Sequence, residues 1–184
     1  MGIVGDSLQR AEQAHFTRPI PKSAGAQMRY LVKQEKSTKA VAELLGISRR
    51  TVERYVKDEI KRPRPELASR TETEVRSRWQ PLVRKRVAQA AAKRTGLVIE
   101  TRARFGFTAA PGSTDDGRMR RITQHLAPEL AGRLLGAQQA GATEAELQAL
   151  AAEGLQEAYF KDGGRRAGDL LVEFTDIDYI DIAY

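Results

Sequence analysis

Apolar residues recur at helical spacing through the first part of the chain. Met28, Leu31 and Val32 form a stripe within residues 24–36, and a weaker pattern of the same kind runs through residues 1–18. Positions three or four apart lie on one face of an α-helix. We therefore expect a helix in each segment, separated by the two prolines of the intervening sequence RPIPKSAG.

Two further apolar stripes lie on either side of Gly46, within residues 38–57, TKAVAELLGISRRTVERYVK. This pattern predicts a helix-turn-helix. Gly46 supplies the turn, because a positive φ is cheap only for glycine. Ser48 caps the second helix, and Ala42 is small where the two helices cross. The residues expected in the core are Val41, Ala42, Leu45, Ile47, Val52 and Tyr55 or Val56.

The second helix of this motif presents polar residues outward. A recognition helix carries its base-reading groups on that face, with its N-terminal residues deepest in the major groove. Arginine pairs with guanine through two hydrogen bonds, and glutamate accepts one from cytosine N4. An ordinary helical hairpin is the alternative, which the basic face disfavours. The candidate DNA-binding residues of this helix are Ser48, Arg49, Arg50, Thr51, Glu53, Arg54 and Lys57.

Alternating prolines follow the motif. Pro63 and Pro65, interleaved with Arg62 and Arg64, indicate an extended, solvated linker and a domain boundary. The sequence TETE, residues 71–74, has the form of a capping box and predicts that a helix begins at Thr71.

The helix predicted from Thr71 continues to about Arg94, and Pro81 either kinks or splits it. Gly96 stands where a helix C-terminus expects glycine. Phosphate contact is the expected role of the cations near its middle, and a solvated helix face is the alternative. The candidate phosphate-binding residues here are Arg84, Lys85 and Arg86.

The hydrophobic period changes to two over residues 97–107, LVIETRARFGF. Apolar residues and threonine alternate there with Arg102 and Arg104, which predicts a strand with one apolar face and one basic face. The acidic tail, residues 169–184, is strand-like, and the two strands are candidates to pair with each other. The helices predicted between them cover about residues 118–125, 129–138 and 144–160.

These elements predict a mainly α fold with a small β component. We expect an N-terminal helical region over residues 1–62 that contains the helix-turn-helix, a basic linker and helix over residues 63–95, and a C-terminal α/β part over residues 96–184. The helix-turn-helix domain and the α/β part would each be small, as 184 residues allow.

Composition narrows the function further. The chain has no cysteine and only two histidines, far apart, which argues against disulfides and a zinc site, so we predict no metal site. Residues 1–110 carry 24 Lys and Arg against 11 Asp and Glu, whereas residues 111–184 carry 7 against 13. A basic segment of this size favours a polyanion partner. The N-terminus lacks the pattern of a signal peptide and no apolar run has the length of a membrane span, so we expect a soluble cytoplasmic protein with no membrane partner.

Nothing in the sequence assembles a catalytic set. It has no GxxxxGK[ST] phosphate loop and no HExxH motif, and neither histidine neighbours a candidate nucleophile. A loop of small residues, AAPGSTDDG at 109–117, carries two hydroxyls, Ser113 and Thr114, followed by Asp115 and Asp116. From the residues alone, this loop is more simply a turn before a capped helix.

Three segments together resemble the telomere-protecting terminal proteins of streptomycete linear chromosomes and plasmids. These segments are VAELLGISRRTVERYVKDEIKRP, TGLVIETRARFGFTAAPGSTDDGRMR and VEFTDIDYIDIAY. The helix-turn-helix by itself would not identify that family, but its combination with the other two segments does. The resemblance extends over the whole chain.

The resemblance implies a protein bound covalently to the 5′ ends of linear DNA, which caps the telomere and primes synthesis of the terminal gap. In this family a threonine hydroxyl accepts the first deoxynucleotide, and the matching residue here is Thr114. The chain would then be a primer and substrate rather than an enzyme, with no cofactor of its own. Mg²⁺ and the deoxynucleotide would come with the partner DNA polymerase.

The resemblance also implies the partners. They are telomeric DNA, both duplex and 3′ overhang, a DNA polymerase and a telomere-associated DNA-binding protein, with self-association as a further option. It places the protein at the nucleoid of a bacterium. The alternative function is a helix-turn-helix transcriptional regulator or partition protein with a C-terminal dimerisation domain. A nuclease or resolvase is a third option, with little support in the sequence.

Overall fold

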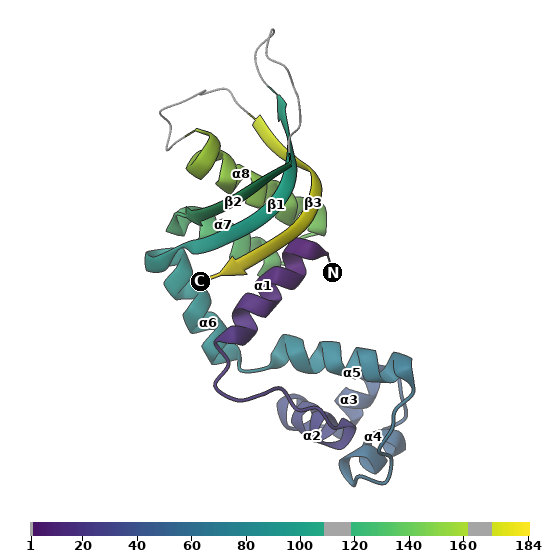
Figure 1. Cartoon of the computed structure of the whole chain (residues 1–184). Helices are drawn as coiled ribbons and strands as arrows, with labels where there is room; N and C mark the ends of the chain where they lie inside the picture. Colours follow the sequence, from purple (N-terminus) through teal and green to yellow (C-terminus); the bar gives the residue numbers. More distant parts are fainter. Residues whose placement is uncertain (1, 109–118, 162–170) are drawn as a thin grey trace. The chain divides into compact units, whose positions relative to one another are not determined.

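The computed structural model describes residues 2–108, 119–161 and 171–184. The chain divides into two compact units. We call residues 17–81 the helical unit and residues 1–16 with 82–184 the sheet unit, and Figure 1 traces the elements of each. The chain is mainly α-helical with one small sheet, as predicted. Among the described helices, none combines the length and the apolar character needed to cross a membrane.

Four helices make up the helical unit. They are α2 (Ala24–Glu35), α3 (Thr38–Leu45), α4 (Arg49–Val56) and α5 (Pro65–Arg78). All four contribute to one apolar core, and the helix predicted over residues 24–36 is confirmed. The fully buried core residues include Met28, Leu31, Val41, Leu45, Val52 and Val75.

Helix α5 begins earlier than predicted. Pro65 occupies its first turn, where proline loses no hydrogen bond and has the right φ. Thr71 is buried in the middle of this helix, so the prediction of a capping box there is wrong. Leu67, Thr71 and Val75 are four residues apart and turn toward the core. The helical unit therefore extends past the predicted boundary at residue 62.

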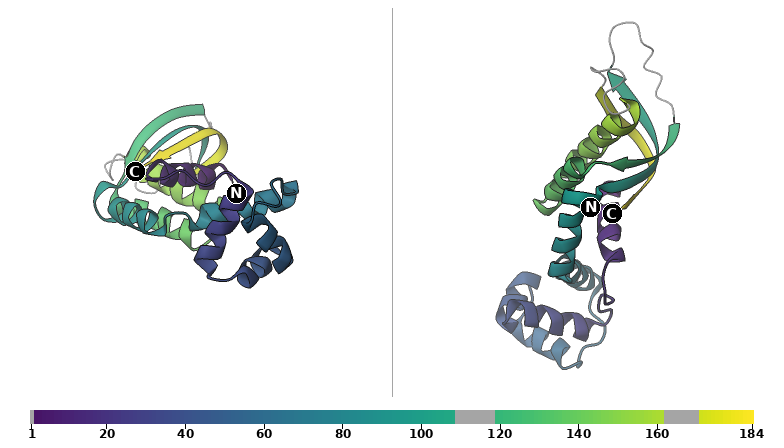
Figure 2. Two further views of the ribbon diagram at one scale, coloured as in Figure 1. Left: turned by 90° about the horizontal axis from the view of Figure 1, so that it is seen from below. Right: turned by 90° about the vertical axis from the view of Figure 1, so that its left-hand side faces the viewer.

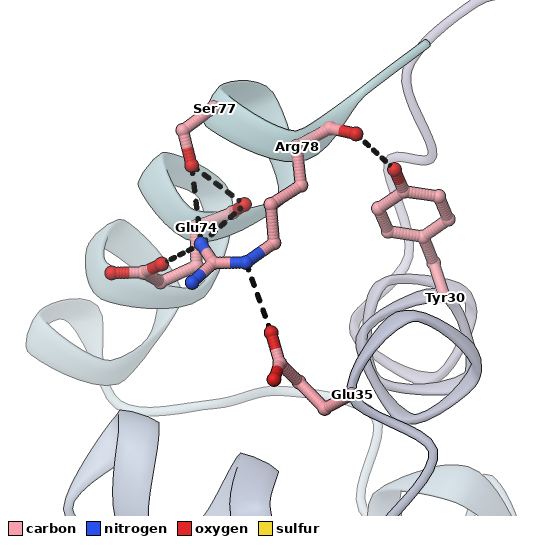
Figure 3. Close-up of polar contacts among 5 residues, drawn as sticks. All are labelled: Tyr30, Glu35, Glu74, Ser77 and Arg78. Carbon is pink, nitrogen blue, oxygen red and sulfur yellow. Dashed lines mark hydrogen bonds and ion pairs between the residues drawn. The ribbon is translucent and has the colours of Figure 1, made fainter. Parts of the chain in front are cut away.

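Arg78 ties α5 to α2, as Figure 3 shows. Its guanidinium donates to Glu35 of α2 at 3.1 Å and to Glu74 one turn earlier. Its carbonyl oxygen accepts a hydrogen bond from the hydroxyl of Tyr30. The side chains of Arg78, Glu35 and Glu74 are each one-third exposed or less. These partly buried contacts hold the two helices together.

Pro81 splits the predicted long helix, one of the two outcomes expected. The chain turns at Gln80, whose φ is 48°, and α6 (Pro81–Ala90) then begins. A single π-helical turn, η1 (Ala91–Thr95), follows α6. Gly96 ends it with a φ of 65°, which confirms its predicted role.

The sheet has three antiparallel strands in the order β2-β1-β3. Strand β1 (Leu97–Thr108) lies in the centre, between β2 (Met119–Leu126) and β3 (Leu171–Ala183). The strand predicted over residues 97–107 and the strand-like tail are both confirmed, and they pair with each other. The helix predicted over residues 118–125 is wrong, because β2 occupies it.

Helices α7 (Pro128–Gln139) and α8 (Glu144–Leu155) lie on the same side of this sheet, as the views in Figure 2 show. A second π-helical turn, η2 (Gln156–Phe160), extends α8 and completes the predicted helix over residues 144–160. The helix predicted over residues 129–138 is confirmed as well. The core between these helices and the sheet includes Leu97, Ile99, Phe105, Leu126, Leu134, Leu155, Ile180 and Ile182.

Helix α1 (Ile3–Ala14) belongs to the sheet unit rather than to the predicted N-terminal region. It buries Val4 and Leu8 in the same core. It also satisfies backbone groups on β3: the Ser7 hydroxyl accepts from the Ile182 amide at 2.9 Å, and Arg10 donates to the Ile180 carbonyl at 3.4 Å. Part of this edge strand is thereby protected from pairing with another chain.

We expect Gly96→Ala to lower the free energy of unfolding by about 3 kcal/mol or more, since it combines strain with overpacking. A Cβ at this position would lie 2.1 Å from the Leu126 carbonyl oxygen. Gly141→Ala is the matched control, because Gly141 also has a positive φ, 82°, but has open space around it. Urea denaturation should show a cost of about 1 kcal/mol for the control. Equal costs for the two variants would contradict the steric argument.

Candidate nucleic-acid interface

Helices α3 and α4 form the predicted helix-turn-helix. The Ser37 hydroxyl accepts from backbone amides at the start of α3, and Gly46 ends that helix with a φ of 64°. The Ser48 hydroxyl caps α4 by accepting from the Thr51 amide at 3.1 Å. The predicted roles of Gly46 and Ser48 are thus both observed. The Ser48 and Thr51 hydroxyls also bond to each other at 2.9 Å.

The interior of the motif follows the predicted pattern. Val41, Ala42, Leu45, Val52 and Tyr55 are buried, and Ile47 and Val56 pack partly buried against them. Burial raises the pKa of the Tyr55 hydroxyl above its ordinary value, although Arg54 and Arg64 oppose the shift. One face of α4 is therefore fixed in the core, which leaves the opposite face to a ligand.

The outward face of α4 is basic. Arg50, Arg54 and Lys57 are exposed there. Together with Glu53 and Glu59 they line a hollow of about 220 Å³. Cations that surround a hollow on an exposed helix face suit a polyanion, because each contact with a phosphate releases a counterion.

Ion pairs divide the cations of this face into two kinds. Arg49 donates to Glu53 at 2.8 Å, and Arg54 donates to Glu59 at 3.3 Å. The side chains of Arg50 and Lys57 make no hydrogen bond or ion pair with any residue that the structure describes. In the described conformation Glu53, a candidate for reading cytosine, holds Arg49 instead. Arg50 and Lys57 are therefore the cations of this helix that are open to DNA without breaking an internal contact.

The three cations predicted on α6 have different environments. Arg84 binds Glu12 of α1, and the side chains are 20% and 3% exposed. A mostly buried arginine paired with a buried carboxylate stabilises the fold, so the structure argues against Arg84 as a phosphate contact. Lys85 and Arg86 are exposed. These three residues lie in the sheet unit, whereas the candidate residues of α4 lie in the helical unit.

Thr114 lies outside the described residues, and so do Ser113, Asp115 and Asp116. What the structure describes is the pair of strands that the segment joins. Strand β1 ends at Thr108 and β2 begins at Met119, and the two run antiparallel with Arg104 opposite Met119. Residues 109–118 therefore connect two hydrogen-bonded neighbours in the sheet.

A second hollow of about 410 Å³ lies on the other side of α4. Thr51 belongs to the predicted set, whereas Arg64 and Arg70 were not predicted as DNA-binding residues. The sequence feature that could have placed them is the helical spacing of Leu67, Thr71 and Val75. This apolar face packs α5 against the helix-turn-helix. The walls of this hollow are Ile47, Thr51, Tyr55, Arg64, Glu66, Leu67 and Arg70.

Comparison with known families agrees with this geometry. Residues 26–63 match the homeodomain-like domain. The match begins in α2, spans α3 and α4, and ends just before α5. The chain thus carries a helix-turn-helix DNA-binding domain. No curated protein matches the chain, and no solved structure matches it.

We expect Arg50→Ala to weaken DNA binding about tenfold, since a well-placed arginine contact contributes about 1–3 kcal/mol. Lys33→Ala is the matched control: Lys33 is an exposed cation on α2, without a hydrogen bond or ion pair to the described residues. Fluorescence anisotropy at one fixed salt concentration measures both variants on the same duplex. Equal losses would indicate that only the net charge of the helical unit matters.

Proposed function

We propose that this chain is a DNA terminal protein that primes DNA synthesis from the Thr114 hydroxyl. The helix-turn-helix domain holds the DNA, and the segment between β1 and β2 offers the hydroxyl. The observation that carries the proposal is the placement of this segment: a candidate acceptor lies between two paired strands of a chain that also has a DNA-binding domain. The resemblance of three segments to the streptomycete terminal proteins supports the same function.

The firm packing of strand β1, from which the segment departs, supports a primer role. Phe105 of β1 is fully buried, and its ring packs 5.2 Å from Phe160 and 5.1 Å from Phe174, centroid to centroid. Strand β1 is also hydrogen-bonded on both sides along most of its length. A reacting group is positioned more reproducibly when its segment departs from packed, paired strands.

The reaction requires only a hydroxyl group from this protein. The Thr114 oxygen attacks the α-phosphorus of a deoxynucleoside triphosphate, a P–O ester forms and pyrophosphate leaves. The hydroxyl proton passes to a base or water in the polymerase site. The polymerase would supply the metal ions that stabilise the attacking and leaving oxygens in such a transfer. The side chains around the hydroxyl must be small enough for it to enter the polymerase site, and the alanines and glycines of the segment are small.

The test is covalent labelling. Purified protein is incubated with labelled deoxynucleotides, linear-replicon template and a cell extract as the source of polymerase. We expect label on the protein that survives boiling in detergent and depends on the template. Tight binding to an internal duplex site without any adduct would overturn the proposal and favour the regulator or partition protein.

A further inference from the structure

A short basic segment follows the recognition helix directly. Lys61, Arg62, Pro63 and Arg64, which we call the arm, belong to no helix or strand. The three cations are exposed. Their side chains make no hydrogen bond or ion pair with the described part of the chain. This sets them apart from Arg29, Arg54 and Arg78 of the same unit, which are all paired.

Both ends of the arm are anchored. At one end, Ile60 packs against the core of the helical unit, and the preceding turn is held by Arg29, which donates to the Val56 carbonyl at 2.9 Å and to Asp58 at 2.7 Å. At the other end, Leu67 packs against the same core, and Arg70 donates to the Leu45 carbonyl at 2.9 Å.

The backbone of the arm is also restricted in conformation between these two ends. Proline fixes its own φ and keeps the residue before it extended, so Pro63 and Pro65 restrict Arg62 and Arg64. The arm therefore has few conformations to lose when it binds. Its exposed charges are held in place beside α4 rather than on a loose tail, which lowers the entropic cost of binding.

The larger hollow lies between α4 and the N-terminal half of α5, with Arg64 of the arm in its wall. Thr51 and Tyr55 of α4 form one side, and Arg64 and Arg70 the other. Glu66 also lines it, at the N-terminus of α5, where the helix dipole offsets a negative charge. The volume of about 410 Å³, a hydroxyl and two guanidinium groups suit a sugar-phosphate strand. On DNA, the strand that borders the major groove separates it from the minor groove.

We propose that the arm enters the minor groove next to the major-groove site of α4. With α4 in the major groove, the bordering phosphates lie in the hollow against Arg64, and Arg62 reaches past that strand into the minor groove. A narrow A·T-rich minor groove has an enhanced negative potential that attracts arginine. The arm thus adds a preference for A·T pairs beside the site that α4 reads. This inference rests on the DNA-binding domain and is independent of Thr114.

The experiment uses the full-length protein and duplexes with a randomised centre. Sites are selected separately with the wild-type protein and with Arg62→Ala/Arg64→Ala. We expect the same core sequence from both, and an A·T run beside it only for the wild type. Anisotropy then compares the selected duplex with one whose flanking adenines are replaced by 2,6-diaminopurine. That base adds an amino group in the minor groove and leaves the major-groove edge unchanged.

The wild-type protein should bind the substituted duplex about tenfold more weakly, the usual size of a mismatch effect. The double alanine variant should bind both duplexes equally. Arg62→Lys/Arg64→Lys keeps the charge but not the planar, weakly hydrated guanidinium, and should lose part of the discrimination. If diaminopurine has no effect on the wild type, or if lysine preserves the full preference, the arm contacts phosphates only and the proposal fails. Circular dichroism confirms that each variant is folded.

Discussion

Thr114→Ala is expected to abolish the detergent-resistant adduct between the protein and a deoxynucleotide. The reason is chemical: alanine has no oxygen to form the P–O ester, and no activation by the polymerase can replace it. DNA binding should not change, because the candidate DNA contacts on α4, the arm and α6 do not include Thr114. The measurement is the labelling assay with the wild-type and variant proteins side by side.

Ser113→Ala is the matched control for that result. Ser113 is the neighbouring hydroxyl in the same segment, so its loss makes a similar change in volume and polarity. The adduct should persist in this variant. Thr114→Ser should also retain label, since it keeps a hydroxyl at the same position. An adduct that disappears only with Ser113→Ala would move the acceptor by one residue and contradict the assignment to Thr114.

Arg84→Ala is expected to lower the free energy of unfolding by about 3 kcal/mol, the usual cost of breaking a buried ion pair by removing one partner. The cause is Glu12, whose side chain is 3% exposed and would be left with an uncompensated charge. Burial is the largest cause of the raised pKa of Tyr184, and the nearby charge of Glu12 raises it further. Both effects indicate that this site is poorly solvated. Urea denaturation measures the loss.

Two variants test the mechanism of this loss. Lys85→Ala removes an exposed cation from the same helix and should change stability by no more than about 0.5 kcal/mol. Adding Glu12→Gln to Arg84→Ala should recover part of the stability, since the stranded charge is gone. A large drop in DNA affinity with unchanged stability in Arg84→Ala would instead restore Arg84 as a phosphate contact.

The strand β2 illustrates a limit of reading periodicity. Its inward residues, Ile122 and Leu126, are four apart. That spacing fits one face of a helix and one face of a strand equally well. What decides is the pairing with β1, where Ile122 lies opposite Thr101, and no property of residues 119–126 alone contains that information.

The same limit explains the errors around α5 and α1. Thr71 and Glu74 have the spacing of a capping box, but the helix has already begun at Pro65, and burial of Thr71 overrides the local signal. Sequence also cannot assign an amphipathic helix to a core. Helix α1 precedes the helical unit in the chain yet packs with β3, where its Ser7 bonds to Ile182, 175 residues later.

The helix-turn-helix was predictable because its signals are local. Gly46 and Ser48 set the turn and the cap within a few residues, and the buried positions follow from a period of 3.6. The ion pair between Arg49 and Glu53 joins residues four apart on one helix, a spacing that the sequence shows. The pair between Arg54 and Glu59 was not predictable, because Glu59 lies beyond the end of α4. The same holds for the arm, whose importance depends on how α5 packs.

The most direct test of the central claim is to locate the nucleotide on the protein. After labelling and nuclease treatment, trypsin cleaves after Arg104 and Arg118 and releases the peptide Phe105–Arg118, whose hydroxyls are Thr108, Ser113 and Thr114. We expect tandem mass spectrometry to find a deoxynucleoside monophosphate on this peptide, attached at Thr114. A labelled protein whose nucleotide lies on any other peptide, or at Thr108 or Ser113, would contradict the account.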